Sequence, residues 1–407
     1  MTIAIILTIK EKFTNLTGNI YIRAFIYSLV GFLVLRLFSS SVMLLDIFFP
    51  SPDAVDSEIT RRIINGLKEQ NNFFRFFLAP WYRWDTARYL EISNFGYDFN
   101  LVNVVWPPLY PFLVKIFSFI FKPSIFASII VSNLFLVFSL FLFYLLTNDY
   151  FDEEIAKKSL FFLLLFPSSF YFIAGYSESL FLFLSISVFL LLRKKRWLWA
   201  GFIAALATLT RVQGLLLVIP ILVELVKEHK EEKILKQLFT HSIACVYAPI
   251  SYGLYSMYVH YGLHTDYPWV MLNKYWNQRF GLPWEGIIGT TRFLINNIGK
   301  YYDPSQFMNF LNLSLVLVTA ILLVTMRKKI PLSLSIYSWF MLFVIIGKID
   351  HNDVFVGSIR YIMVIFPIYW EMVFLVNNKV KKIFFFSISI ILQIIQIVFF
   401  YWWVWVS

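Results

Sequence analysis

The chain contains 407 residues and carries a formal net charge of +11, with 59% hydrophobic and only 14% charged residues. Soluble domains have about 45–50% apolar and about 25% charged residues, so the composition excludes an ordinary soluble protein and predicts a polytopic membrane protein. A basic charge can indicate nucleic-acid binding, but Lys and Arg also gather in the cytoplasmic loops of membrane proteins. No nucleic-acid partner is therefore expected. The single cysteine, Cys245, lies in an apolar segment, so neither an intramolecular disulfide nor a cysteine-based metal site is expected.

Apolar segments recur along the whole sequence. A membrane-spanning helix needs roughly 20 apolar residues, so we predict an all-α protein with about 11–12 membrane segments in one integral-membrane domain, 1–407. The predicted spans are 20–48, 124–147, 159–175, 178–193, 197–209, 213–227, 239–261, 307–326, 331–347, 356–376 and 382–405. Segment 107–121 is short and rich in proline, so we expect a re-entrant or short helix there. The apolar start, 3–9, is also short and lacks a small-residue cleavage site, so no cleavable signal peptide is expected.

Clusters of Lys and Arg predict which ends of the spans face the cytoplasm. They lie at 157–158, 193–196, 227–236, 327–329 and 379–382. The alternation that follows from them puts two long loops on the outer face, a first external loop at 49–106 and a second at 262–306. It also puts Arg211, the 348–353 loop and Arg360 on that face.

The stretch 81–97 is the first long polar interruption of the chain, with one Asp, one Glu, two Arg and five Trp or Tyr. Residues 85–93 are predicted to be helical, which places Asp85, Arg88 and Tyr89 on one face, and Gly96 is expected to end the helix. Taken by itself, the pattern also fits an interfacial helix whose aromatic rings lie among lipid headgroups.

Four blocks of sequence resemble the PIG-V family, that is, GPI mannosyltransferase 2 and its prokaryotic relatives within the GT-C class of glycosyltransferases. They are Trp84-Asp85…Tyr89-Leu90…Ile92…Gly96-Tyr97 with Trp106-Pro107-Pro108-Leu109-Tyr110-Pro111, Gly175-Tyr176-Ser177-Glu178-Ser179-Leu180-Phe181, Thr210-Arg211…Gly214, and Arg360-Tyr361…Pro367. The blocks follow the order of the family over most of the chain.

The resemblance implies a metal-independent, inverting transfer of mannose or a similar hexose, without a cofactor. It further implies a polyprenyl-phosphate donor, a glycolipid, glycan or protein acceptor, and a multi-pass protein embedded in the lipid bilayer. That bilayer would be the cell membrane of a prokaryote or the endoplasmic reticulum membrane of a eukaryote, with the active site on the extracytoplasmic side.

Asp85 is the candidate general base, because the acceptor hydroxyl needs a carboxylate within hydrogen-bond reach and the resemblance places the acidic residue of the GT-C first loop here. Four other carboxylates of the region are rivals: Asp46, Asp53, Asp56 and Glu58. The alternative to a catalytic role is that Asp85 forms a purely structural ion pair with Arg83 or Arg88.

The phosphate of such a donor needs cationic groups around it. Arg211 lies between two apolar segments, where a charge is costly and calls for a polar partner. Thr208, Thr210 and Gln213 are local candidates, a lipid phosphate is another, and snorkelling to the interface is the structural alternative. Gln213 and its neighbour Val212 depart from the residues common in the family. The substrate-binding candidates are Trp84, Arg88, Tyr89, Tyr176, Glu178, Arg211, Gln213, Arg360 and Tyr361.

Other interpretations remain open at this point. Ser177 could cap the helix that follows it, with Glu178 in its first turn. His351 with Asp350 and Asp353 is only a weak metal-binding pattern, and no metal site is expected. A GT-C enzyme for another sugar and a lipid or solute transporter are the alternative functions. Transporters place their charges at midplane sites between repeats, whereas the charged candidates here gather at one face.

Overall fold

The computed structural model describes residues 18–47, 66, 69, 71–232, 241–299 and 304–404. Within these residues, four helices are long and apolar enough to cross a membrane: α2 (Ile20–Met43), α6 (Ser124–Tyr150), α15 (Pro304–Met326) and α19 (Lys379–Tyr401). The described strands are two of three residues each, β1 (Gln278–Phe280) and β2 (Lys348–Asp350). The prediction of an all-α, multi-pass membrane protein is therefore confirmed.

Shorter helices fill the space between the four long ones. They are α4 (Asp85–Phe95), α5 (Leu109–Ser118), α7 (Glu153–Leu164), α8 (Glu178–Arg193), α9 (Trp197–Thr210), α10 (Val218–Glu232), α12 (Tyr247–Met257), α13 (Pro268–Trp276), α14 (Pro283–Asn296), α16 (Leu332–Gly347), α17 (Ser358–Ile362) and α18 (Ile368–Leu375). Single turns of 3₁₀ or π helix extend or join several of them, at Leu44–Ile47, Phe74–Leu78, Ala79–Trp81, Leu101–Val105, Ser169–Phe172, Val212–Leu217, Ile243–Cys245 and Tyr258–Gly262.

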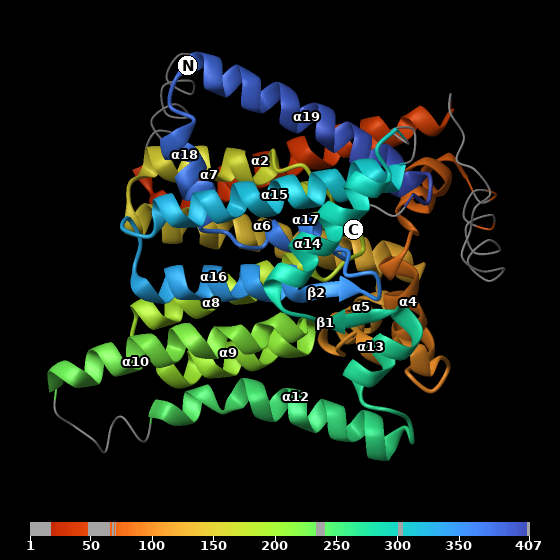
Figure 1. Ribbon diagram of the computed structural model, residues 1–407, viewed down its shortest axis with the longest axis horizontal. Coiled ribbons are helices and arrows are strands. Elements are labelled where there is room, and N and C mark those ends of the chain that lie inside the picture. The colour runs from red at the N-terminus through yellow and green to blue at the C-terminus, as the bar shows by residue number, and fades with distance from the viewer. Residues whose placement is uncertain are drawn as a thin grey trace, which may run out of the picture.

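The helices form one bundle whose two ends differ. Helices α6, α8, α9 and α12 pack side by side in that order, and α2 packs on the other side of α6. At one end, on the right in Figure 1, the short elements α4, α5, α13, α14, β1 and β2 gather. At the opposite end lie the turns that join α8 to α9, α15 to α16 and α18 to α19 (Figure 1).

Several predicted spans are broken where the sequence was expected to give a continuous helix. The predicted span 159–175 is helical only as far as Leu164, because Pro167 follows and cannot donate a backbone hydrogen bond. The predicted span 356–376 consists of α17 and α18, which are separated around Pro367. Segment 107–121 contains the 10-residue helix α5, in agreement with a short helix. These breaks are buried, so neighbouring helices surround the irregular backbone rather than lipid.

The predicted loop 262–306 has a fold of its own. Helix α13, strand β1 and helix α14 follow one another in it, and β1 pairs antiparallel with β2, with Gln278 opposite Asp350 and Phe280 opposite Lys348. Helix α14 packs against α15 and α16. The loop is thereby fixed over the end of the bundle where α4 also lies (Figure 1).

Candidate functional site

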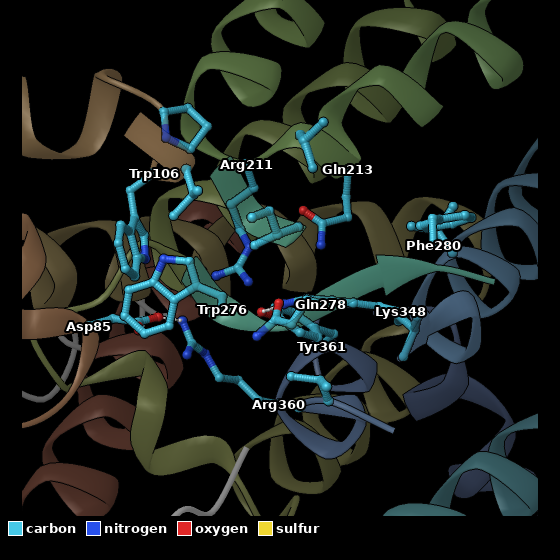
Figure 2. A pocket seen from close by; sticks show the side chains of 18 of the residues that line it. Asp85, Trp106, Arg211, Gln213, Trp276, Gln278, Phe280, Lys348, Arg360 and Tyr361 are labelled. Carbon is cyan, nitrogen blue, oxygen red and sulfur yellow. Dashed lines mark hydrogen bonds and ion pairs between the residues drawn. The ribbon is translucent and has the colours of Figure 1, made fainter. Parts of the chain in front are cut away.

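A cavity of about 180 Å³ opens at this end of the bundle, and elements from the whole chain contribute to its wall. Figure 2 shows Arg211 and Arg360 reaching into it from opposite sides, with Trp106 and Trp276 on one side and Lys348 on another. The lining residues are Asp85, Tyr89, Val105, Trp106, Pro107, Thr210, Arg211, Val212, Gln213, Leu272, Trp276, Gln278, Phe280, Val344, Ile345, Lys348, Val356, Gly357, Arg360 and Tyr361.

The backbone before α4 sets the position of Asp85. Trp84 has a φ of 51°, a positive value that is uncommon for residues other than glycine, and its indole packs on Trp403 with ring centroids 5.3 Å apart. The preceding residue, Arg83, is buried and donates to the carbonyl oxygens of Tyr401 and Ala79. The chain is thus tied to the end of α19, and Asp85 becomes the first residue of a helix that ends at Gly96 as predicted.

Arg211 stands where α9 stops. Its backbone is extended and a 3₁₀ turn, Val212–Leu217, follows. This turn returns directly over α9: a Cβ at Gly214 would lie 2.3 Å from the backbone nitrogen of Thr208. Only glycine allows this close approach, which explains the Thr-Arg…Gly spacing and leaves the Arg211 side chain free to point away from α9 into the cavity (Figure 2).

Beneath the cavity, Glu178 joins the two arginines. Its Oε1 accepts from Nη1 of Arg211 at 2.5 Å and from Nε of Arg360. Arg360 in turn places Nη2 2.7 Å from Oδ2 of Asp85. The side chains of Glu178, Arg360, Arg211 and Asp85 are 1%, 3%, 9% and 15% exposed, so this four-residue network, which we call the Asp85–Arg360–Glu178–Arg211 network, is largely removed from water.

The network controls the charge of Asp85, which lies outside the long apolar helices. Burial raises the pKa of its carboxyl, but the guanidinium of Arg360, with added contributions from Arg211 and Lys348, outweighs burial, so the pKa lies below its ordinary value. Asp85 is therefore an anion held by a cation, and it can accept a proton more readily once Arg360 has another partner.

Lys348 adds a third cation to the site. Its Nζ donates to the hydroxyl of Tyr361 at 2.7 Å, and the Tyr361 ring also lies 4.7 Å below the guanidinium carbon of Arg211. The three cations Arg211, Arg360 and Lys348 thus face two carboxylates, Asp85 and Glu178, so among the described residues one positive charge at the cavity has no carboxylate to balance it.

Aromatic rings close the cavity on the side of the two loops. Trp106 and Trp276 meet edge to face, with centroids 5.1 Å apart. The carbonyl oxygen of Trp106 accepts hydrogen bonds from the hydroxyls of Tyr97 at 2.6 Å and Tyr255 at 3.3 Å. Gln278 follows in β1, where pairing with β2 fixes its backbone.

The structure separates the predicted site residues into two groups. Asp85, Tyr89, Arg211, Gln213, Arg360 and Tyr361 line the cavity. Trp84, Arg88, Tyr176 and Glu178 do not line it, although each contacts a residue that does or precedes it in the chain. Tyr176 lies 4.5 Å below the Arg360 guanidinium, and Arg88 pairs with Glu91 and lies 5.7 Å from the Trp276 ring.

Two alternatives that the sequence left open differ from what the structure shows. Asp85 pairs with neither Arg83 nor Arg88 but with Arg360, which belongs to α17 and lies far from Asp85 in the sequence. Ser177 does not cap α8; its hydroxyl instead contacts the Tyr89 hydroxyl at 2.8 Å and accepts from Arg211 at 3.2 Å.

Arg211 does not snorkel. Its partner is Glu178, and not the Thr208, Thr210 or Gln213 side chains that its surroundings in the sequence suggested: the hydroxyls of Thr208 and Thr210 donate to carbonyl oxygens within α9. The Glu178 carboxylate therefore neutralises the buried charge of Arg211, as the apolar surroundings of Arg211 in the sequence required.

The remaining candidates have other partners or fall outside the described part. Asp53, Asp56 and Glu58 lie outside the described residues, and Asp46 lies in the turn Leu44–Ile47. Asp350 accepts from the backbone N–H groups of Asn352 and Val354, and Asp353 pairs with Arg279. The two carboxylates beside His351 thus serve the turn and a neighbouring loop.

Sequence reasoning missed Trp106, Trp276, Gln278 and Lys348 as residues of the cavity. Trp106 stood in one of the four blocks, and the prediction placed Lys348 and the second loop on the same face as Asp85, which agrees with their position at one end of the bundle. Which residues of these segments face the cavity depends on the β1–β2 pairing, and three-residue strands leave no periodic signal in the sequence.

Comparisons with known proteins add a family context. The sequence model of the dolichyl-phosphate-mannose-protein mannosyltransferase family matches residues 105–252, a range that contains Trp106, Glu178 and Arg211 but neither Asp85 nor Arg360. GPI mannosyltransferase 2 of Schizosaccharomyces pombe is 30% identical over 152 residues, which are 36% of this chain and 32% of that protein. The chain thus covers about a third of the length of this curated relative. No solved structure matches. Both matches confirm the resemblance to PIG-V-like glycosyltransferases of the GT-C class that the four sequence blocks indicated.

Proposed function

We propose that this protein is a membrane glycosyltransferase that transfers mannose or a similar hexose from a polyprenyl-phosphate donor to an acceptor hydroxyl at the extracytoplasmic face. The acceptor is a glycolipid, a glycan or a protein. In this proposal Asp85 is the general base, Arg211, Arg360 and Lys348 hold the donor phosphate, and the configuration at the anomeric carbon is inverted.

The observation that carries the proposal is the meeting of one carboxylate and three cations in a single cavity. Asp85, Arg211, Arg360 and Lys348 all line it, although they come from α4, the end of α9, β2 and α17. Two cations would suffice to balance Asp85 and Glu178, so the third makes the site complementary to an anion. Arginine can bind two phosphate oxygens at once, and a phosphate is the leaving group of the proposed donor.

In the proposed reaction one bond forms, one bond breaks and one proton is transferred. The acceptor oxygen attacks the anomeric carbon of the hexose from the face opposite the phosphate, and the bond between that carbon and the phosphate oxygen breaks. The bonding electrons leave with the phosphate, whose added charge is stabilised by the arginines. The acceptor proton passes to Asp85.

The ion pair between Asp85 and Arg360 gives the donor a role in preparing the base. In the structure as described, Arg360 lowers the pKa of Asp85, and a carboxylate with a lowered pKa is a weak base. A donor phosphate would compete for the Arg360 guanidinium and add negative charge nearby, and both effects raise the pKa of Asp85. Asp85 would then become a better base only when donor is present.

A transporter is less well supported by the same geometry. Transporters bind their cargo near the midplane, between repeats with broken helices. Here the charged cavity lies at the end of the bundle where the loop elements gather (Figure 1).

The test is transfer of radiolabel from polyprenyl-phosphate mannose in membranes that contain the wild-type protein or Asp85→Asn. We expect label to enter a new product with the wild type. Asp85→Asn retains the size of the side chain but cannot take the proton, so turnover should fall by about 10²–10⁴-fold while donor binding remains. Label that stays on the donor with a well-folded wild-type protein would refute the proposed activity.

Asp98→Asn is the matched control. It makes the same chemical change at an exposed position just after α4, and it should leave turnover unchanged. If Asp85→Asn loses folded protein in proportion to activity, its role is structural and not that of a base.

A further inference from the structure

Two polar atoms in the cavity wall lack a partner although they are buried. The indole Nε1 of Trp276 and the side-chain oxygen Oε1 of Gln278 have no hydrogen-bond partner among the described residues. Both residues line the cavity, and Gln278 is only 8% exposed. They follow each other closely at the end of α13, on either side of Asn277, whose left-handed backbone turns the chain into β1.

Such atoms are rare in folded proteins, because a buried donor or acceptor without a partner costs free energy. Here the cost is borne by two atoms of opposite kind: an N–H that can only donate and an amide oxygen that can only accept. A ligand with neighbouring hydroxyl groups satisfies both, because one hydroxyl accepts from the indole and another donates to the amide oxygen.

The surroundings hold the Trp276 ring and the Gln278 backbone in place. The Trp276 ring contacts Trp106 edge to face, at an interplanar angle of 88°, and lies 5.7 Å from the guanidinium carbon of Arg88. Arg88 itself is held by Glu91, and Asn103 donates to the same carboxylate at 2.8 Å. The backbone of Gln278 is fixed by its pairing opposite Asp350. A wall that is fixed before a ligand arrives loses little entropy on binding.

The chemistry of this wall matches a sugar ring. Two indoles offer apolar surface for the C–H groups of a pyranose, and the indole N–H and amide oxygen offer directed contacts for its hydroxyls. The cavity volume of about 180 Å³ is below the roughly 300–1,000 Å³ of pockets for drug-sized ligands. It suits one sugar residue rather than an oligosaccharide.

We propose that Trp106, Trp276 and Gln278 form the subsite for the hexose of the donor, and that Gln278 helps to select which hexose is transferred. The inference rests on the proposed function, because that function places the donor phosphate at Arg211 and Arg360 in the same cavity. A hexose joined to this phosphate has only the remaining cavity wall to occupy, and Trp276 and Gln278 belong to that wall.

Two substitutions remove one contact each. Trp276→Phe keeps an aromatic ring without the N–H, and Gln278→Leu keeps the approximate size without the oxygen. A neutral hydrogen bond contributes about 0.5–1.5 kcal/mol, so each variant should raise the donor KM by about two- to tenfold. The KM for the acceptor should not change.

The preference of the enzyme for one donor hexose over another tests the subsite more directly than the donor KM does. Polyprenyl-phosphate mannose and polyprenyl-phosphate glucose, supplied as competitors, give the ratio of the two kcat/KM values. Gln278→Leu should bring this ratio closer to one. Trp284→Phe is the control: Trp284 is 57% exposed in α14 of the same loop and does not line the cavity, so both the ratio and the KM should match those of the wild type.

A second measurement does not depend on turnover. Methyl α-mannoside in excess should raise the Tm of the wild type, because a ligand that binds only the folded state stabilises it, and it should raise the Tm of Gln278→Leu less. An unchanged donor KM and sugar ratio in Gln278→Leu, a change confined to the acceptor KM, or equal Tm shifts in both proteins would each overturn the subsite. A wild type that uses no polyprenyl-phosphate hexose would instead refute the proposed function, and the Tm comparison would still decide whether this wall binds a hexose.

Discussion

The two ends of the bundle use the same charged residue types in opposite ways. At the cavity end, Arg360, Glu178 and Arg211 are at most 9% exposed and share one carboxylate oxygen. At the other end, Arg193 pairs with Asp149 at 2.6 Å, but the two side chains are 44% and 49% exposed. An exposed pair of this kind contributes about 0–1 kcal/mol, whereas a buried charge that loses its partner is strongly destabilising.

The difference teaches where the chain tolerates a costly arrangement. Burying four charges is rarely the most stable way to fill space, since apolar residues of similar size often do as well or better. The second oxygen of Glu178 is buried without a hydrogen-bond partner among the described residues, so the network is not optimised for stability alone. The proposed binding and release of a donor phosphate would account for this arrangement, whereas a purely structural role would not.

Breaking the network at its centre should have the largest effect on stability. Glu178→Gln leaves Arg211 and Arg360 without their shared carboxylate, and removal of one partner from a buried ion pair costs about 3–5 kcal/mol. The variant should show a much lower Tm in detergent, or little folded protein. Glu178→Asp keeps the charge but shortens the side chain, so its Tm should lie between those of the wild type and Glu178→Gln. A Glu178→Gln protein as stable as the wild type would mean that other groups balance the arginines.

The pH dependence of activity should sharpen the comparison. The pKa of Asp85 in the folded protein is lowered, so the stability that its charge contributes is present above its unfolded pKa, about 3.9, and is lost as the pH falls through the folded pKa. The acidic limb of kcat/KM reports the free enzyme and that of kcat the donor complex. In the proposed reaction the donor phosphate competes for Arg360, so the kcat limb should lie at the higher pH. Coincident limbs, or a kcat limb at the lower pH, would count against a base that the donor releases.

The smallest effect is expected at the opposite end. Arg193→Ala breaks the exposed pair with Asp149 and should change the free energy of unfolding by about 0–1 kcal/mol, without a change in turnover. Thermal unfolding and the transfer assay, both run beside Glu178→Gln, measure this. A loss comparable to that of Glu178→Gln would show that exposure does not distinguish the two ends.

Much of the framework was predictable because it depends on local composition. Hydropathy identified the long helices α2, α6, α15 and α19, and the spacing of polar residues identified α4 with its end at Gly96. Hydropathy could not place the breaks after Leu164 and before α18, since both segments are as apolar as a continuous span. An interrupted helix is tolerated there because neighbouring helices, and not lipid, surround the irregular backbone.

The sequence by itself determined that this chain enters a membrane, that Asp85 heads a polar helix, and that Arg211 needs a partner within an apolar setting. These properties follow from residues near one another in the chain. Only the tertiary structure decided that the partner of Arg211 is Glu178, that Arg360 holds Asp85, and that Trp276, Gln278 and Lys348 complete the same cavity. Contacts between residues this far apart are set by how α4, α8, α9 and α17 pack and by how β1 meets β2, and an ion pair leaves no pattern in the sequence when its partners belong to different helices.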